Sequence, residues 1–163
     1  MHISNVVTAW ATDLHDDLET AAGDLGVGLR DIAAMTLVAS HPDVPVDWLR
    51  ARIGLSQPGT VRLVDRLSAA GLIERAARAG RSVHLAVTPA GQDLLRRWTS
   101  RRDQAVRRLT TGLTPAQESQ LAELLALTLS TPGRPRTEAD QTCRTCDWPA
   151  CGDDCPVDRS VRS

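Results

Sequence analysis

The 163-residue chain contains no tyrosine, no phenylalanine and no lysine. Apolar residues still make up 42% of it, so leucine, valine and alanine must fill the core, with four tryptophans and two methionines. Without tyrosine or phenylalanine, the chain is poorly suited to bind single-stranded nucleic acid by base stacking. Without lysine, all 19 basic residues are arginines, which contact phosphate and guanine through paired hydrogen bonds.

Signatures of membrane proteins and enzymes are also missing. The chain has no run of about 18 apolar residues, as a transmembrane helix requires, and its first residues lack the basic and apolar regions of a signal peptide. We therefore expect a cytoplasmic protein that does not contact a membrane. It has no phosphate-binding loop, no G-x-G-x-x-G motif and no H-E-x-x-H motif, and its four histidines lie apart from any catalytic partner. We expect that it is not an enzyme.

The small net charge of −1 conceals a strong separation of charge along the chain. Residues 1–49 carry a net charge of −7, residues 50–112 carry +9, and residues 113–163 carry −3. A basic segment between two acidic ones indicates an anionic partner, with nucleic acid as the first candidate. The alternative is a solvated surface of mixed charge.

The spacing of apolar residues predicts a mostly helical domain with a small β-hairpin. Ser56 is a favourable N-cap residue, Pro58 fits the first turn of a helix, and Gly71 suits a helix end. The short helix, the glycine-containing turn and the helix that follows make a helix-turn-helix pattern. The predicted helices cover residues 4–25, 29–40, 46–52, 56–70, 88–111 and a segment that starts at 114, and the hairpin strands cover 72–75 and 82–87.

Three segments together resemble the MarR family of winged helix-turn-helix transcriptional regulators, over roughly residues 4–130. They are Gly54-Leu-Ser-Gln-Pro-Gly-Thr-Val-Arg-Leu-Val-Asp-Arg-Leu67, Gly71-Leu-Ile-Glu-Arg75 and Leu85-Ala-Val-Thr-Pro-Ala-Gly91. The resemblance implies a homodimeric regulator, expected to be a repressor. Within a domain of residues 1–131, helices in 4–25 and 89–131 would form the dimer, and residues 29–88 would bind double-stranded DNA.

The resemblance places the recognition helix, residues 56–70, in the major groove and the wing, residues 72–87, in the minor groove. A dimer would then read an inverted repeat with half-sites about one helical turn apart. Because Leu63, Val64 and Leu67 are expected to face the core, the opposite face of the helix is left for DNA. The candidate DNA contacts are Ser56, Gln57, Pro58, Gly59, Val61, Arg62, Arg66, Arg75, Arg78 and Arg81.

Each of these contacts has its own expected role. Gln57 and Arg62 suit adenine and guanine edges, and Val61 suits a thymine methyl group. Backbone N–H groups at Ser56 and Gly59 can bind phosphate, and Arg66, Arg75 and Arg78 are expected to contact phosphate as well. The alternative for Arg66 is a surface ion pair with Asp65 or Glu74. The family's wing carries Asp-x-Arg, and this chain has Ala79-Gly80-Arg81, which keeps the minor-groove arginine and lacks the acid.

All four cysteines lie in a tail, residues 143–163, after an expected linker at 132–142. Cys143, Cys146, Cys151 and Cys155 have the spacing C-x2-C-x4-C-x3-C, which suits one tetrahedral zinc ion. An iron–sulfur cluster is the first alternative, because the final C-x3-C-P resembles the end of the bacterial ferredoxin motif. A thiol switch and a dispensable tail are the others. Most members of the resembled family lack such a tail.

The resemblance also implies a small-molecule effector in a cleft between the dimer helices and the DNA-binding part. Trp10, His15, Met35 and Trp48 are the candidate lining residues, with ordinary core packing as the alternative interpretation. A function of another class is also open, namely a winged-helix interaction module that has lost DNA binding. The charge of +9 on residues 50–112 argues against that module.

Overall fold

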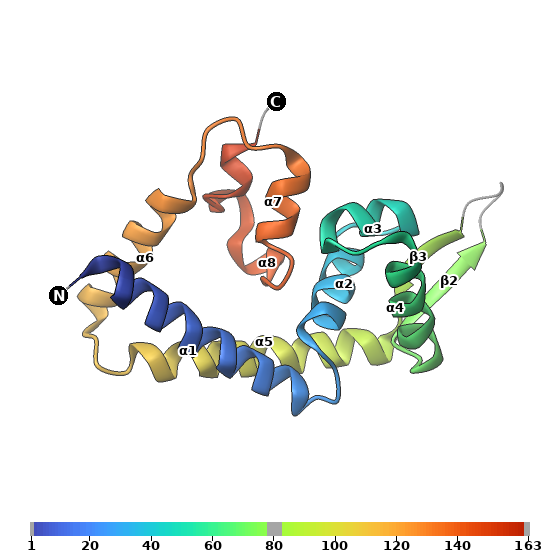
Figure 1. Cartoon of the computed structure of the whole chain (residues 1–163), viewed down its shortest axis with the longest axis horizontal. Helices are drawn as coiled ribbons and strands as arrows, with labels where there is room; N and C mark the ends of the chain where they lie inside the picture. The colour runs from blue at the N-terminus through green and yellow to red at the C-terminus, as the bar shows by residue number, and fades with distance from the viewer. Residues whose placement is uncertain (1, 78–82, 162–163) are drawn as a thin grey trace.

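The computed structural model describes residues 2–77 and 83–161 of the chain. Two long helices, α1 (Ile3–Gly23) and α5 (Pro89–Thr110), lie side by side in opposite directions and form an arm (Figure 1). Helix α6 (Pro115–Leu129) turns back from the end of α5. No helix in the described ranges is both long and apolar enough to span a membrane.

A compact head follows α1 and holds the predicted helix-turn-helix. It contains α2 (Leu29–Ser40), α3 (Val46–Ile53) and α4 (Gln57–Ala69), and a three-stranded antiparallel sheet in the order β1-β3-β2. The strands are β1 (Val44–Pro45), β2 (Ile73–Ala77) and β3 (Val83–Val87). The predicted hairpin is therefore confirmed, and the short strand β1 is an addition that the sequence pattern did not indicate.

The head and the inner face of the arm share one hydrophobic core. Its fully buried members include Ile32, Met35, Leu37, Leu49 and Trp98. The predicted inner face of α4 is confirmed, because Leu63, Val64 and Leu67 are buried in the same cluster. The core therefore fixes which side of α4 is left for solvent.

Local sequence signals set the ends of the head's helices. The Ser56 hydroxyl accepts a hydrogen bond from the Gly59 N–H at 3.3 Å, and the Thr88 hydroxyl accepts one from the Gly91 N–H at 3.1 Å. Gly54 ends α3 with a φ of 65°, in the left-handed region that favours glycine. These caps position the turn before α4 and the start of α5.

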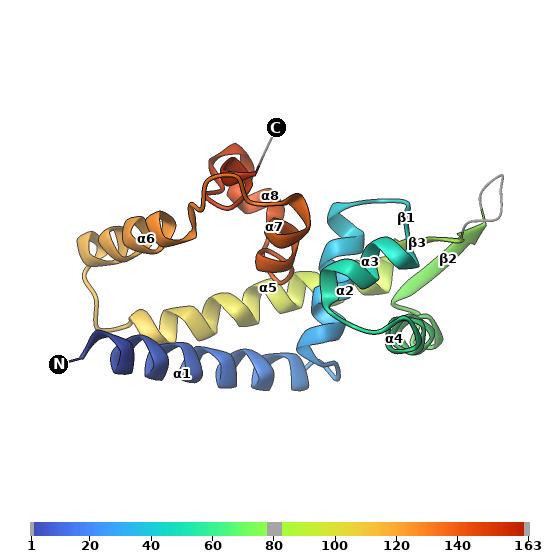
Figure 2. The ribbon, with the colours of Figure 1, turned by 45° about the horizontal axis from the view of Figure 1, so that its top comes forward.

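The end of the chain forms a small C-terminal lobe, residues 134–161, between α6 and the head (Figure 2). It contains α7 (Arg136–Thr142), α8 (Trp148–Cys151) and two 3-10 turns, Gly152–Asp154 and Asp158–Ser160. Ala139, Cys155 and Val157 form its own small apolar cluster. Most of the expected linker at 132–142 is therefore helical, because α7 packs against this cluster and against α3.

Candidate nucleic-acid interface and cysteine cluster

The side of α4 that faces away from the core is polar and open to solvent. Ser56, Gln57, Pro58, Val61, Arg62 and Arg66 are exposed there, and Gly59 is half-buried. Thr60, on the opposite side, is fully buried. The structure therefore brings the candidate DNA contacts of α4 together on one exposed face near the start of the helix, where the Gly59 N–H, predicted to bind phosphate, is instead bonded to the Ser56 hydroxyl.

Two of the candidate phosphate contacts form ion pairs within the chain. Arg66 pairs with Asp31 of α2, and neither Asp65 nor Glu74, its expected alternatives, is its partner. Arg75 of β2 pairs with Asp65 of α4 at 2.7 Å. By contrast, within residues 2–77 and 83–161, the Arg62 side chain has no hydrogen bond or ion pair. Arg62 is thus the α4 arginine that is available to a base without breaking an existing contact.

The wing is carried by strands β2 and β3, which pair over five residues from Ile73↔Val87 to Ala77↔Val83. Strand β1 adds to the other edge of β3 through Val44 and Pro45. The predicted tip contacts Arg78 and Arg81, and the Ala79-Gly80 pair between them, lie outside the described residues. The described part of the wing therefore contributes Arg75 at its base.

The four cysteines line one cavity of about 130 Å³ inside the C-terminal lobe. Cys155 is buried, Cys143 and Cys146 are half-buried, and Cys151 is exposed. Hydrogen bonding to Cys146 raises the pKa of the Cys143 thiol, and burial raises it further. The same hydrogen bond lowers the pKa of Cys146 to about 7, aided by the positive charge of Arg102. Burial raises the pKa of Cys151.

The donor set of this cavity fits a thiophilic metal ion, because four thiolates are the ligands of many structural zinc sites. In the parts of the chain that the structure describes, no three His, Cys, Asp or Glu side chains are already arranged to hold a metal. Metal binding therefore requires the thiol groups to turn from their mutual hydrogen bonds toward a common point. The lobe's cavity, with all four sulfur side chains on its wall, allows such a movement.

The four candidate effector residues do not line one cavity. Met35 is fully buried in the core, and Trp10 is half-buried on α1. His15 lines an open cavity between α1, α2, α3 and the lobe. The Trp48 ring packs against His41, with ring centroids 4.7 Å apart, and against the Arg52 guanidinium at 3.8 Å. For Met35 and Trp48, packing is therefore the role that the contacts support.

Two acidic residues matter here that the sequence interpretation did not single out. Asp31 is buried beneath Arg66, and Asp140 of α7 is buried beneath Arg52 of α3. The partners are 35 and 88 residues apart in sequence, so no local spacing connects them. The sequence signal that could have identified these two residues is weaker than a local spacing. It is an acidic residue at an otherwise apolar position of a helix.

The sequence model of the MarR family matches residues 25–82, which include α2 to α4 and the start of the wing. Over these residues the chain is similar to the MarR family. Members of this family are transcriptional regulators and not enzymes, as expected from the absent catalytic motifs. No curated protein matches the chain.

Solved structures of MarR-family proteins share the fold. MepR, a transcription regulator of the Staphylococcus aureus multidrug efflux pump MepA, is 17% identical with a TM-score of 0.72, over 80% of this chain and 98% of MepR. Rv1404 of Mycobacterium tuberculosis is 21% identical with a TM-score of 0.71, over 81% of this chain and 93% of Rv1404. Rv2887 of the same organism, solved with p-aminosalicylic acid, is 19% identical with a TM-score of 0.62, over 77% of this chain and 96% of Rv2887. These likenesses show that the chain shares the fold of these proteins.

Proposed function

We propose that the chain is a homodimeric transcriptional repressor that reads an inverted repeat in double-stranded DNA. The observation that carries this proposal is the exposed face of α4, with Gln57 and with Arg62, whose side chain has no hydrogen bond or ion pair among the described residues. A glutamine suits the edge of adenine and an arginine suits the edge of guanine in the major groove. The Gln57 N–H at the start of α4 adds a donor for a backbone phosphate, since the Gly59 N–H is taken by the Ser56 hydroxyl.

The apolar faces of the arm support the second copy of the chain in this proposal. Helix α6 has no buried residue, and Leu124 and Leu127 are 62% and 72% exposed. On α1, Ile3 is 73% exposed and Val7 lies one turn further along the same face. Exposed apolar side chains in such numbers are typical of an interface between protein chains. A second copy that packs its own α1 and α6 on these faces would bury both.

Selection from a random duplex library tests the DNA proposal. We expect the full chain to enrich an inverted repeat and to bind it at least about a thousandfold more tightly than random duplex. A template whose promoter contains the selected repeat should give less transcript when the chain is added. Equal affinity for all duplexes, or binding by a monomer to a single half-site, would contradict the proposal.

For the C-terminal lobe we propose a zinc site formed by Cys143, Cys146, Cys151 and Cys155. The proposal rests on the donor chemistry and on the single cavity that the four side chains share. Elemental analysis and a visible absorption spectrum of protein purified without oxygen test it. One zinc per chain and a colourless sample are expected. Iron and sulfide in a brown sample would show an iron–sulfur cluster in place of the proposed zinc. A metal-free sample would show that the cysteines are free thiols.

A further inference from the structure

The C-terminal lobe contacts the head and the arm through one short segment, residues 140–148. Asp140 forms a 2.6 Å ion pair with Arg52 of α3, and the Gln141 amide donates to the Ala51 carbonyl at 2.9 Å. The Thr145 carbonyl accepts a hydrogen bond from the indole of Trp98 in α5 at 3.2 Å. The Trp148 ring lies edge-on to His41 at the end of α2, with centroids 4.8 Å apart. One segment thus touches α2 and α3 of the head and α5 of the arm.

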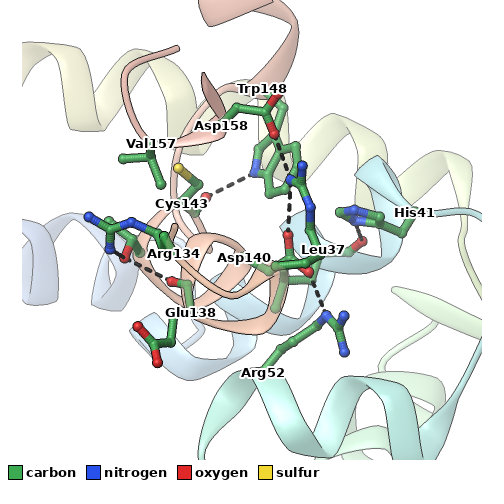
Figure 3. Close-up of polar contacts among 12 residues, drawn as sticks. Leu37, His41, Arg52, Arg134, Glu138, Asp140, Cys143, Trp148, Val157 and Asp158 are labelled. Carbon is green, nitrogen blue, oxygen red and sulfur yellow. Dashed lines mark hydrogen bonds and ion pairs between the residues drawn. The ribbon is translucent and has the colours of Figure 1, made fainter. Parts of the chain in front are cut away.

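The Arg52–Asp140 ion pair is the most deeply buried of these contacts (Figure 3). The Asp140 side chain is fully buried and the Arg52 side chain is 11% exposed. One Asp140 oxygen takes Arg52, and the other has no hydrogen bond among the described residues, since Arg136 stands 3.7 Å away. Arg52 is therefore the strongest partner of this buried carboxylate and the one that joins α7 to α3, so its loss should weaken the docking of α7.

The same segment contains half of the cysteine cluster. Cys143 follows Asp140 by one turn, at the C-terminal end of α7, and its carbonyl accepts a 2.9 Å hydrogen bond from the Trp148 indole. Cys146 lies between Thr145, which contacts α5, and Trp148, which contacts α2. A change in the positions of Cys143 and Cys146 therefore changes the docking contacts directly.

We propose that DNA binding by this chain responds to a thiolate-binding metal ion, and that the Arg52–Asp140 ion pair transmits the response from the cysteines to α3. This inference rests on the proposed function. Binding of zinc at the cysteines holds residues 140–148 in the docked conformation, and the docked segment holds α3, the first helix of the helix-turn-helix. A head that is already ordered loses less conformational freedom on DNA, so the zinc-bound chain binds its operator more tightly.

The test measures operator affinity and zinc content of the full chain with Zn²⁺ and with a chelator. For the unmodified chain, we expect removal of zinc to raise the Kd for the selected duplex roughly fivefold or more. Asp140→Asn should still bind one zinc per chain, but its Kd should no longer depend on zinc. Asp154→Asn is the matched control, because this exposed carboxylate lies 3.9 Å from Arg159 within the lobe and pairs neither with the head nor with Arg136. It should keep the full response.

Hydrogen exchange of α3 gives a second measurement that does not depend on DNA. Zinc should slow exchange in residues 46–53 of the unmodified chain and leave it unchanged in Asp140→Asn. If Asp140→Asn fails to fold, Arg52→Gln replaces it, because glutamine can still donate a hydrogen bond to Asp140 but removes the charge of the ion pair. Loss of the zinc response is again expected, and a full response in this variant would contradict the role of the ion pair.

The outcomes separate this inference from the function on which it rests. Specific DNA binding with zinc bound but no effect of zinc on the Kd overturns the inference and leaves the DNA-reading function in place. A full zinc response in Asp140→Asn overturns the role of the ion pair. Absence of any zinc binding overturns both the inference and the zinc site. Absence of specific DNA binding in every state overturns the proposed function itself.

Discussion

Arg66 of the recognition helix α4 forms an ion pair with Asp31, a buried carboxylate near the start of α2. The second oxygen of Asp31 accepts a hydrogen bond from the Gly28 N–H at 3.0 Å and so caps α2. One carboxylate therefore fixes the beginning of α2 and the orientation of α4 together. Arg66 remains 61% exposed while Asp31 holds it, so its guanidinium is still open to a phosphate.

Replacement of Asp31 tests this double role. In Asp31→Asn the charge-assisted bond to Arg66 is lost, and the free energy of unfolding should fall by about 1–3 kcal/mol. Urea denaturation followed by circular dichroism measures the change. Asp65→Asn is the control, because its pair with Arg75 is exposed, and it should cost less than about 1 kcal/mol. An equal decrease in the free energy of unfolding in the two variants would mean that the Asp31–Arg66 pair stabilises the fold no more than an exposed ion pair does.

Arg62 is the residue on which base recognition should depend most. In Arg62→Ala, affinity for the selected repeat should fall by about 1–3 kcal/mol, with relaxed preference at one position of each half-site. Binding to random duplex should change little. Fluorescence anisotropy at fixed salt measures both affinities, since phosphate contacts are strongly salt-dependent.

Arg97→Ala is a suitable control for the Arg62 experiment. Arg97 is an exposed arginine of α5 that pairs with Asp93 in the arm and not in the head. Its loss removes the same charge and should leave the sequence preference of the chain unchanged. Equal weakening of specific and random binding in Arg62→Ala would show that Arg62 contacts phosphate and not a base.

Gly91, in the first turn of α5, permits a close approach between this helix and the sheet. A Cβ atom there would lie 2.2 Å from the Leu72 carbonyl oxygen and 2.6 Å from a methyl group of Val87. Gly91→Ala should therefore lower the free energy of unfolding by about 1–3 kcal/mol or more, as measured by thermal denaturation. Gly23→Ala, at the helical end of α1 with no atom within 4 Å, should instead be neutral or stabilising. A neutral Gly91→Ala would show that α5 shifts easily against the sheet.

Much of the head could be predicted from the sequence because its signals are local. Ser56, Thr88 and Thr114 each cap a helix at a point where a hydroxyl precedes an apolar pattern. Each hydroxyl accepts a hydrogen bond from the backbone N–H of the residue three positions later, as expected of an N-cap. The alternation of β3 and the inner face of α4 likewise depend only on near neighbours. The order of helices and hairpin follows from such signals.

Long-range pairs could not be predicted in this way. Nothing near Asp140 in sequence identifies Arg52 as its partner, and the segment that contains α7 was expected to be a linker. Its order comes from contacts with distant residues, namely Trp98 and Ala51, and from its own cluster around Ala139 and Val157. Arg66 is a similar case, because its nearby acids were the expected partners and a residue of α2 is the partner in the fold.

Leu127, on the exposed face of α6, should be central to the association of two copies. In Leu127→Glu the charge would enter an apolar interface, so the dimer should dissociate at least about tenfold more readily. Sedimentation velocity over a range of concentrations measures this. The fold of each chain should persist, because Leu127 is 72% exposed and lies outside the hydrophobic core.

Val61→Glu is the matched control, because it places the same charge at an exposed apolar position of α4. This variant should remain a dimer and lose DNA affinity, since the new carboxylate would face phosphate. Leu127→Glu should instead lose the dimer, and loss of operator binding should follow as a consequence. A fully dimeric Leu127→Glu variant would place the interface on another surface of the arm.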